Sequence, residues 1–207
     1  MPDAGVYGVY VKPCGDIMPS ASTITGSAQV TVVLPIGNDI KDLSLYAGVW
    51  QQNATVSGPE ESPNKNYISF GFLTDSPQIL LEVGKETLLF TFEIDGNATE
   101  PKLMDNNQDP FAVFPNSLNT NPGNEMSILD IGASPVGYYY YAGNYFDDDP
   151  KSCTVTVDTT NTETTDTTSN NGETPTSTLD EIGEEFYFTL SPNPTSQWIK
   201  VDFSNKV

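Results

Sequence analysis

Oxygen-bearing side chains recur at alternate positions in the segment Asp105-Asn106-Asn107-Gln108-Asp109. Calcium-binding loops use such spacing, because carboxylate and amide oxygens on every second residue can converge on one hard cation. The segment has no glycine at the sixth position and no glutamate at the twelfth, as an EF-hand loop would require. Asp105, Asn107 and Asp109 are therefore candidates for a weak calcium site, and a polar turn between strands is the alternative.

Two cysteines, Cys14 and Cys153, lie near the two ends of the apolar-patterned part of the chain, which has no others. In a reducing compartment such distant cysteines are usually unrelated buried thiols, whereas export favours a disulfide. Because the rest of the composition favours an exported protein, we predict a Cys14–Cys153 disulfide. Across a separation of 139 residues, it would stabilise the fold by about 5 kcal/mol in the chain-entropy model.

Four consecutive tyrosines, Tyr138–Tyr141, form a dense aromatic run. Aromatic faces suit both sugar stacking and protein contacts. In a strand, successive side chains point to opposite faces of the sheet, so two of the four would face a core and two would face outward. We interpret the run as core plus a surface contact patch, and a sugar-stacking platform is the alternative.

Residues suited to catalysis are scarce. The chain has 28 acidic residues, 8 lysines, no arginine and no histidine, which gives a formal net charge of −20. The commonest general base and metal ligand is therefore missing, and no two carboxylates stand in a recognisable glycosidase arrangement. The lack of arginine and the negative charge disfavour nucleic acid and anionic membranes as partners. We predict a protein that is not an enzyme, with calcium as the one cofactor candidate.

Short runs of β-branched and aromatic residues, separated by turn residues, fill the larger N-terminal part of the chain, and no stretch has a sustained helical period. The predicted strands are Val6–Lys12, Gln29–Leu34, Leu43–Trp50, Tyr67–Leu73, Glu86–Ile94, Glu125–Ile131, Val136–Tyr141 and Cys153–Val157. This pattern predicts an all-β fold, an antiparallel β-sandwich of jelly-roll type. The sequence has no run of about 18 apolar residues, so it predicts no membrane-spanning helix.

Composition divides the chain into three parts. Residues 1–157 carry the strand pattern and predict the sandwich domain. Residues 158–184 are rich in Thr, Asn and Asp and nearly free of apolar side chains, which predicts a flexible linker. Residues 185–207 have a strand-turn-strand pattern, and two strands alone are marginal in water, so this tail must dock on another surface. The apolar residues of the tail are Phe186, Phe188, Leu190, Trp198, Ile199, Val201 and Phe203.

The segment Phe188–Ser196 (FTLSPNPTS), followed by Ile199-Lys200-Val201, resembles the start of the C-terminal sorting domain of type IX secretion substrates. The resemblance implies a Bacteroidota-type envelope and export across the outer membrane, and the N-terminal sandwich is similar in style to cohesins. The sorting domains continue through further strands and a glycine-bearing motif that this sequence lacks. Thr159 and Thr167, each in an Asp-Thr-Thr triplet, resemble O-glycosylation acceptors of the same bacteria; a plain Thr-rich linker is the alternative.

Together these features favour an extracellular structural subunit that self-assembles into a filament or a surface layer. Sheet edges are templates for an added strand, so the tail of one copy could pair with the next copy, and such head-to-tail contacts propagate unless they close into a ring. The alternative is a cell-surface adhesin, or a carbohydrate- or protein-binding module, exported by the type IX pathway. The expected partners are other copies of the chain, or surface glycans and proteins.

Overall fold

The computed structural model describes residues 5–13, 19–82, 85–97, 100–145 and 184–192, the last range by its backbone. The strands are β1 (Val6–Pro13), β2 (Thr23–Pro35), β3 (Asp39–Leu45), β4 (Val49–Ser57), β5 (Lys65–Thr74), β6 (Thr87–Asp95), β7 (Lys102–Leu103), β8 (Glu125–Asp130), β9 (Gly137–Asn144) and β10 (Glu184–Pro192). One short 3-10 helix, η1, spans Pro110–Ala112. The predicted all-β class is confirmed. In the described ranges no helix is long and apolar enough to cross a membrane.

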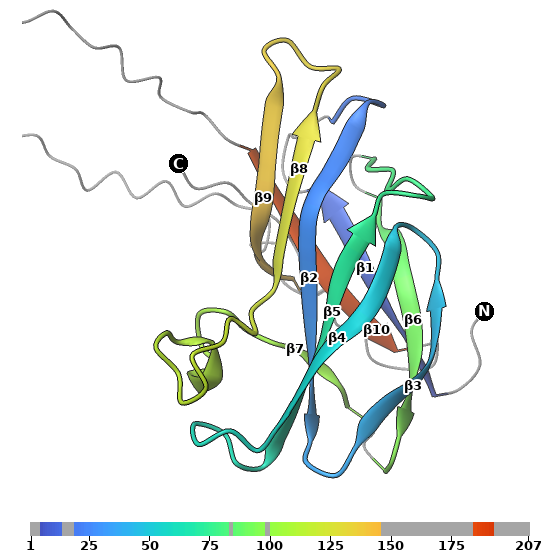
Figure 1. Ribbon diagram of the computed structural model, residues 1–207. Helices are drawn as coiled ribbons and strands as arrows, with labels where there is room; N and C mark the ends of the chain where they lie inside the picture. Colours follow the sequence, from blue (N-terminus) through green and yellow to red (C-terminus); the bar gives the residue numbers. More distant parts are fainter. Residues whose placement is uncertain (1–4, 14–18, 83–84, 98–99, 146–183, 193–207) are drawn as a thin grey trace, which may run out of the picture.

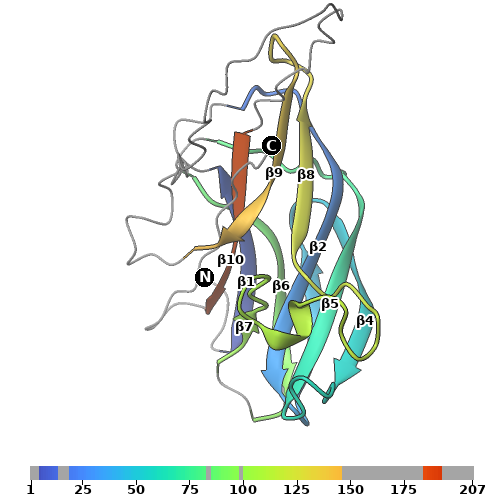
Figure 2. The same cartoon turned by 90° about the vertical axis from the view of Figure 1, so that its left-hand side faces the viewer.

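The strands form two packed layers. Their hydrogen-bonded order is β3-β6-β1-β10-β9-β8-β2-β5-β4, and β7 pairs with β2. This path folds over on itself, so that β8, β2, β5 and β4 pass in front of β10, β1 and β6 in Figure 1 and the two layers stand edge-on in Figure 2. Every pairing between the described strands is antiparallel except the one between β10 and β9. The predicted β-sandwich is thereby confirmed.

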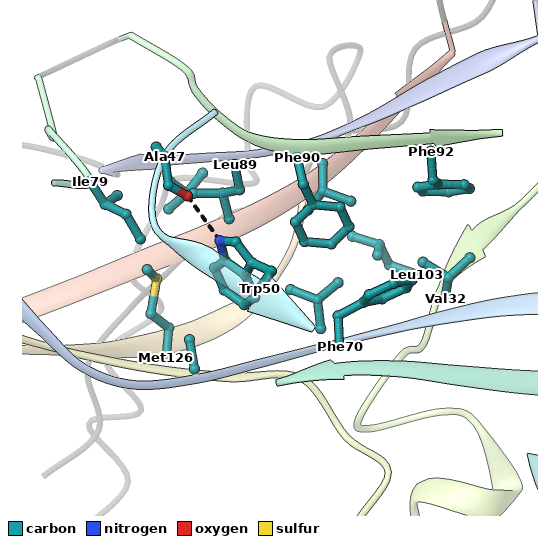
Figure 3. Close-up of a cluster of buried hydrophobic side chains, with 14 of the residues drawn as sticks. Val32, Ala47, Trp50, Phe70, Ile79, Leu89, Phe90, Phe92, Leu103 and Met126 are labelled. Carbon is teal, nitrogen blue, oxygen red and sulfur yellow. Dashed lines mark hydrogen bonds between the residues drawn. The ribbon is translucent and has the colours of Figure 1, made fainter. Parts of the chain in front are cut away.

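Aromatic side chains from both layers fill the space between them (Figure 3). Phe90 of β6 is fully buried, with its ring centroid 5.0 Å from that of Phe70 on β5 and 5.4 Å from that of Trp50 on β4. The indole Nε1 of Trp50 donates to the carbonyl oxygen of Ala47 at 2.9 Å. Its one polar group is therefore satisfied, as the burial of tryptophan requires.

A second, smaller core lies on the outer side of β2 and β5. It consists of the buried residues Val33, Tyr67, Met104 and Phe111. Residues 104–124, which connect β7 to β8, supply Met104 and Phe111 and cover this side of the sheet. Burial on both faces explains why Val30 to Leu34 of β2 are all buried instead of alternating.

The prediction of one strand over residues 43–50 is wrong. β3 ends at Leu45 and β4 begins at Val49, with a turn between them. Gly48 in this turn has a φ of +69°, and a Cβ added there would lie 2.8 Å from Cε2 of Phe72, so the position requires glycine. The apolar residues on both sides of the glycine gave the appearance of one continuous pattern. The strand predicted at 153–157 lies outside the described residues.

Candidate strand-insertion site

The C-terminal strand β10 lies between β1 and β9, antiparallel to the first and parallel to the second. We call this position the β1–β9 slot. Among the described strands, β10 makes the one hydrogen-bonded link between the layer of β1 and the layer of β9, and Figure 2 shows it alongside β1. A strand in this slot continues both flanking ladders, so it supplies main-chain hydrogen bonds along its length.

β1 forms the continuous flank of the slot. Its residues pair with β10 without a shift from Tyr7, opposite Pro192, to Pro13, opposite Phe186. Val9 and Val11 are fully buried, and they pair with Leu190 and Phe188 respectively. Three of the apolar tail residues predicted to take part in docking, Phe186, Phe188 and Leu190, therefore stand opposite buried residues of β1.

β9 forms the interrupted flank. It pairs with β8 from Gly137 to Tyr140, and its far end turns from β8 toward β10 (Figure 2). Its register with β10 aligns Tyr139 with Glu184 and Asn144 with Phe188, with a shift between the two pairs. β10 therefore has a regular ladder on one side and an irregular ladder on the other.

A buried asparagine holds the far end of β9 in place. The Nδ2 of Asn124 donates to the carbonyl oxygen of Met104 at 2.7 Å, and its Oδ1 accepts from the backbone N–H of Thr31 at 2.7 Å. The same Nδ2 lies 3.2 Å from the hydroxyl of Tyr141 and 3.3 Å from Oδ1 of Asn144, both on β9. Burial raises the pKa of Tyr141, so its hydroxyl stays protonated. This network fixes the part of β9 that pairs with β10.

One contact joins the two flanks directly. The Nζ of Lys12 on β1 lies 3.7 Å from the ring centroid of Tyr145, the residue after β9. The Tyr145 ring is buried, and its hydroxyl donates to Oε1 of Glu86. A cation over an aromatic face is attractive, so this contact helps to hold β1 and the end of β9 in position.

No family model, curated protein or solved structure matches this sequence. The resemblance to type IX sorting domains stays a prediction, carried by the tail motif alone. Trp198, Ile199, Val201 and Phe203 lie outside the described residues, so the second predicted strand of the tail is untested.

The candidate calcium ligands Asp105, Asn107 and Asp109 lie in one turn before η1, and the carboxylates of Asp105 and Asp109 accept hydrogen bonds from other groups of the protein. Oδ1 of Asp105 accepts from the backbone N–H groups of Asn107 at 2.8 Å and Gln108 at 3.1 Å. The buried carboxylate of Asp109 receives Nζ of Lys65 and the hydroxyl of Tyr67, each at 2.7 Å. Within the described ranges no three acidic or thiol side chains are grouped so that they could hold a metal ion. Calcium binding stays a prediction.

Four further predicted positions, Cys14, Cys153, Thr159 and Thr167, lie outside the described residues. The disulfide and the glycosylation of the linker therefore stay predictions.

The tyrosine run alternates as predicted. Tyr139 is buried and belongs to the main core, whereas Tyr138 and Tyr140 are 51% and 44% exposed. Tyr138 stands opposite Leu129 of β8, and Tyr140 stands opposite Ser127. The outer face of β9 therefore carries two exposed aromatic rings.

Sequence reasoning missed the buried polar residues Asn124 and Asp130. Asp130, at the end of β8, is fully buried. Its carboxylate accepts from the backbone N–H and the hydroxyl of Ser20 and from the backbone N–H groups of Gly132 and Ala133. Burial by itself would raise the pKa of Asp130, but the hydrogen bonds from Ser20, Gly132 and Ala133 outweigh it and hold the pKa below its ordinary value.

We expect Asp130 to make the stability of the domain depend on pH. Because its pKa is lower in the folded chain than in the unfolded chain, its contribution is complete above the unfolded pKa of about 4. The contribution is lost as the pH falls through the lower, folded pKa. Melting temperatures measured from pH 7 to pH 2.5 should fall less steeply in Asp130→Asn, which cannot ionise, than in the native chain. Parallel curves for the two proteins would contradict the assignment.

Proposed function

We propose that this protein is an extracellular structural subunit that self-assembles head to tail through its C-terminal strand. The observation that carries the proposal is the β1–β9 slot, which takes a strand from the far end of the same chain. If one copy supplies its β10 to the slot of another, every copy has one strand to give and one slot to fill. Repetition of such a contact produces a linear filament or a layer.

The two outer edges of the strand order are poorly suited to strand addition. β3 carries Asp39, Lys41 and Asp42, and Asp42 has a φ of +51° beside a register shift. β4 is almost entirely exposed and polar beyond Trp50, and its ladder with β5 shifts twice. Charges and irregularities of this kind protect sheet edges against pairing with other chains. Strand addition is therefore expected at the β1–β9 slot.

The rest of the proposed function follows from composition and the tail motif. Export by a type IX pathway would place the chain at the cell surface or in the medium. With no histidine or arginine in the sequence, we propose a role without catalysis and without nucleic acid.

A concentration series with the full chain tests the assembly. Light scattering and negative-stain microscopy should show monomers in dilute solution and linear chains of growing length in concentrated solution. A free peptide of residues 184–192, added in excess, should shorten the chains because it fills slots without offering one. Deletion of residues 184–207 should abolish assembly, and the matched deletion of residues 193–207, which keeps β10, should preserve it. Assemblies of equal size in both deletions would contradict the proposal.

A surface-binding module is the second candidate, favoured by the exposed rings of Tyr138 and Tyr140. Beside them the hydroxyls of Ser27 and Ser127 lie 3.0 Å apart on neighbouring strands. Aromatic rings with adjacent hydroxyl groups suit a glycan or a protein surface. Such a module would remain a monomer throughout the concentration series, which separates it from the structural subunit.

A further inference from the structure

The connection before β10 is much longer than the pairing of β10 with β9 requires. Glu184 pairs with Tyr139, so the chain must return from Tyr145 to the level of Tyr139 before β10 begins. At about 3.3 Å per residue of strand, this return covers about 20 Å. The connecting residues 146–183 number 38, and a chain of that length can extend to about 125 Å. Closure of its own domain uses a small part of this length.

The surplus is enough to reach a second domain. The longest described strand, β2, has 13 residues and measures about 43 Å. The connection can extend to about three times that length. A copy packed beside this domain, in any orientation, therefore has its β1–β9 slot within reach of the first copy's β10.

The length of the connection also determines how the slot of the same chain and the slot of a second copy compete for β10. If all 38 residues behave as a coil, as composition predicts for those from residue 158 on, their root-mean-square end-to-end distance is about 34 Å, of the same order as the 20 Å or so that closure requires. A connection that behaves as a coil gives an effective concentration of about 1 mM. At about 1 μM protein, a slot is therefore filled by its own chain's β10 about a thousand times more often than by the β10 of a second copy. At about 1 mM protein, the two are equally frequent.

We propose that β10 is an exchangeable plug. In the dilute protein it fills the slot of its own domain and keeps the chain monomeric, and among crowded copies it passes to the slot of a second copy of this chain. The backbone pairs, from Tyr7 with Pro192 to Pro13 with Phe186, are the same in both states. Local concentration, such as that reached on a crowded cell surface, is therefore the switch. This inference rests on the proposed function and adds its regulation.

Two full-length variants, each with one introduced cysteine, test the exchange. One copy carries Tyr10→Cys on β1 and the other carries Thr189→Cys on β10, positions that pair directly. Directly opposed residues of antiparallel strands have Cα atoms about 4.5–5.5 Å apart, within the range that a disulfide spans. Equal amounts are equilibrated at 10 μM or 1 mM and then oxidised, and peptide mass spectrometry identifies the bond between the two introduced cysteines. The native cysteines are present in all samples and form a constant background.

We expect roughly fifty-fold more of the linked product, as a fraction of chains, at 1 mM than at 10 μM. A matched pair of Tyr10→Cys with Ser191→Cys should give almost none, because Ser191 stands opposite Gly8. The double variant Tyr10→Cys/Thr189→Cys should form the bond within one chain at 10 μM. Failure of this bond, or no linked product between copies at 1 mM, would overturn the plug.

The double variant Tyr10→Cys/Thr189→Cys, oxidised at 1 mM, separates this inference from the proposed function, because each of its chains carries both cysteines of the paired positions. A covalent ladder of dimers, trimers and longer chains supports both. Closed dimers alone would support strand exchange and contradict the head-to-tail subunit.

Discussion

Replacement of Phe90 by alanine should lower the free energy of unfolding by about 3–5 kcal/mol, the usual cost of deleting a buried aromatic ring. Phe90 is fully buried and contacts Phe70 and Trp50, which come from the opposite layer of the sandwich. Its removal leaves a cavity between the layers that the neighbouring rings can only partly fill. For a domain of this size the melting temperature should fall by roughly 10 °C or more.

Phe114 provides the matched control, because its side chain is 71% exposed. Phe114→Ala removes the same ring from the surface and should change stability by no more than about 0.5 kcal/mol. Chemical denaturation of the three proteins, fitted with a common slope, makes the comparison. Equal losses in the two variants would mean that the aromatic core between the layers is not the main source of stability.

The sequence predicts the fold class because the alternation of the strands follows directly from burial on one face. Val6–Pro13 and Thr87–Asp95 fall within one or two residues of their predicted ranges. The edge strand β4 was missed beyond Trp50, because an edge strand exposed to water needs no apolar residues. The beginning of β2 was missed for a similar reason, since Thr23 and Thr25 are buried polar residues in an otherwise exposed stretch.

The sequence predicted one part of the candidate site, the docking strand, but not the strands that flank it. The apolar alternation of residues 186–190 predicted a strand that had to dock, but nothing local in the sequence names its neighbours. On its β1 flank, the slot arises from pairing between residues that lie more than 170 positions apart, such as Val9 and Leu190. Asn124 and Asp130 were missed because buried polar residues look like turn residues in a sequence, and only their partners distinguish them.

Asp109→Ala should lower the free energy of unfolding by about 3 kcal/mol, within the range for removing one partner of a buried charged network. The Asp109 side chain is 7% exposed, and its Oδ2 lies 2.7 Å from Nζ of Lys65. Its Oδ1 accepts from the hydroxyl of Tyr67 and from the backbone N–H of Phe111, which caps η1. Alanine would remove the acceptor of the Tyr67 hydroxyl and of the Phe111 N–H in the smaller core, and also the partner of the Lys65 ammonium group.

An exposed ion pair of the same kind supplies the control. Lys41 and Glu93 lie 3.9 Å apart, with side chains 47% and 42% exposed, and Glu93→Ala should cost no more than about 0.5 kcal/mol. Denaturant unfolding of the two alanine variants measures the difference; equal losses would contradict the role given to Asp109.

The same pair of variants tests the calcium prediction. If Asp109 binds calcium, the ion should raise the melting temperature of the native chain and of Glu93→Ala, but not that of Asp109→Ala. Sodium at equal ionic strength should leave the differences in melting temperature among the three proteins unchanged. Since Lys65 already occupies the Asp109 carboxylate, calcium would have to displace it. A calcium effect that persists in Asp109→Ala would therefore place the ion elsewhere in the chain and leave this carboxylate as the anchor that ties residues 104–124 to β5.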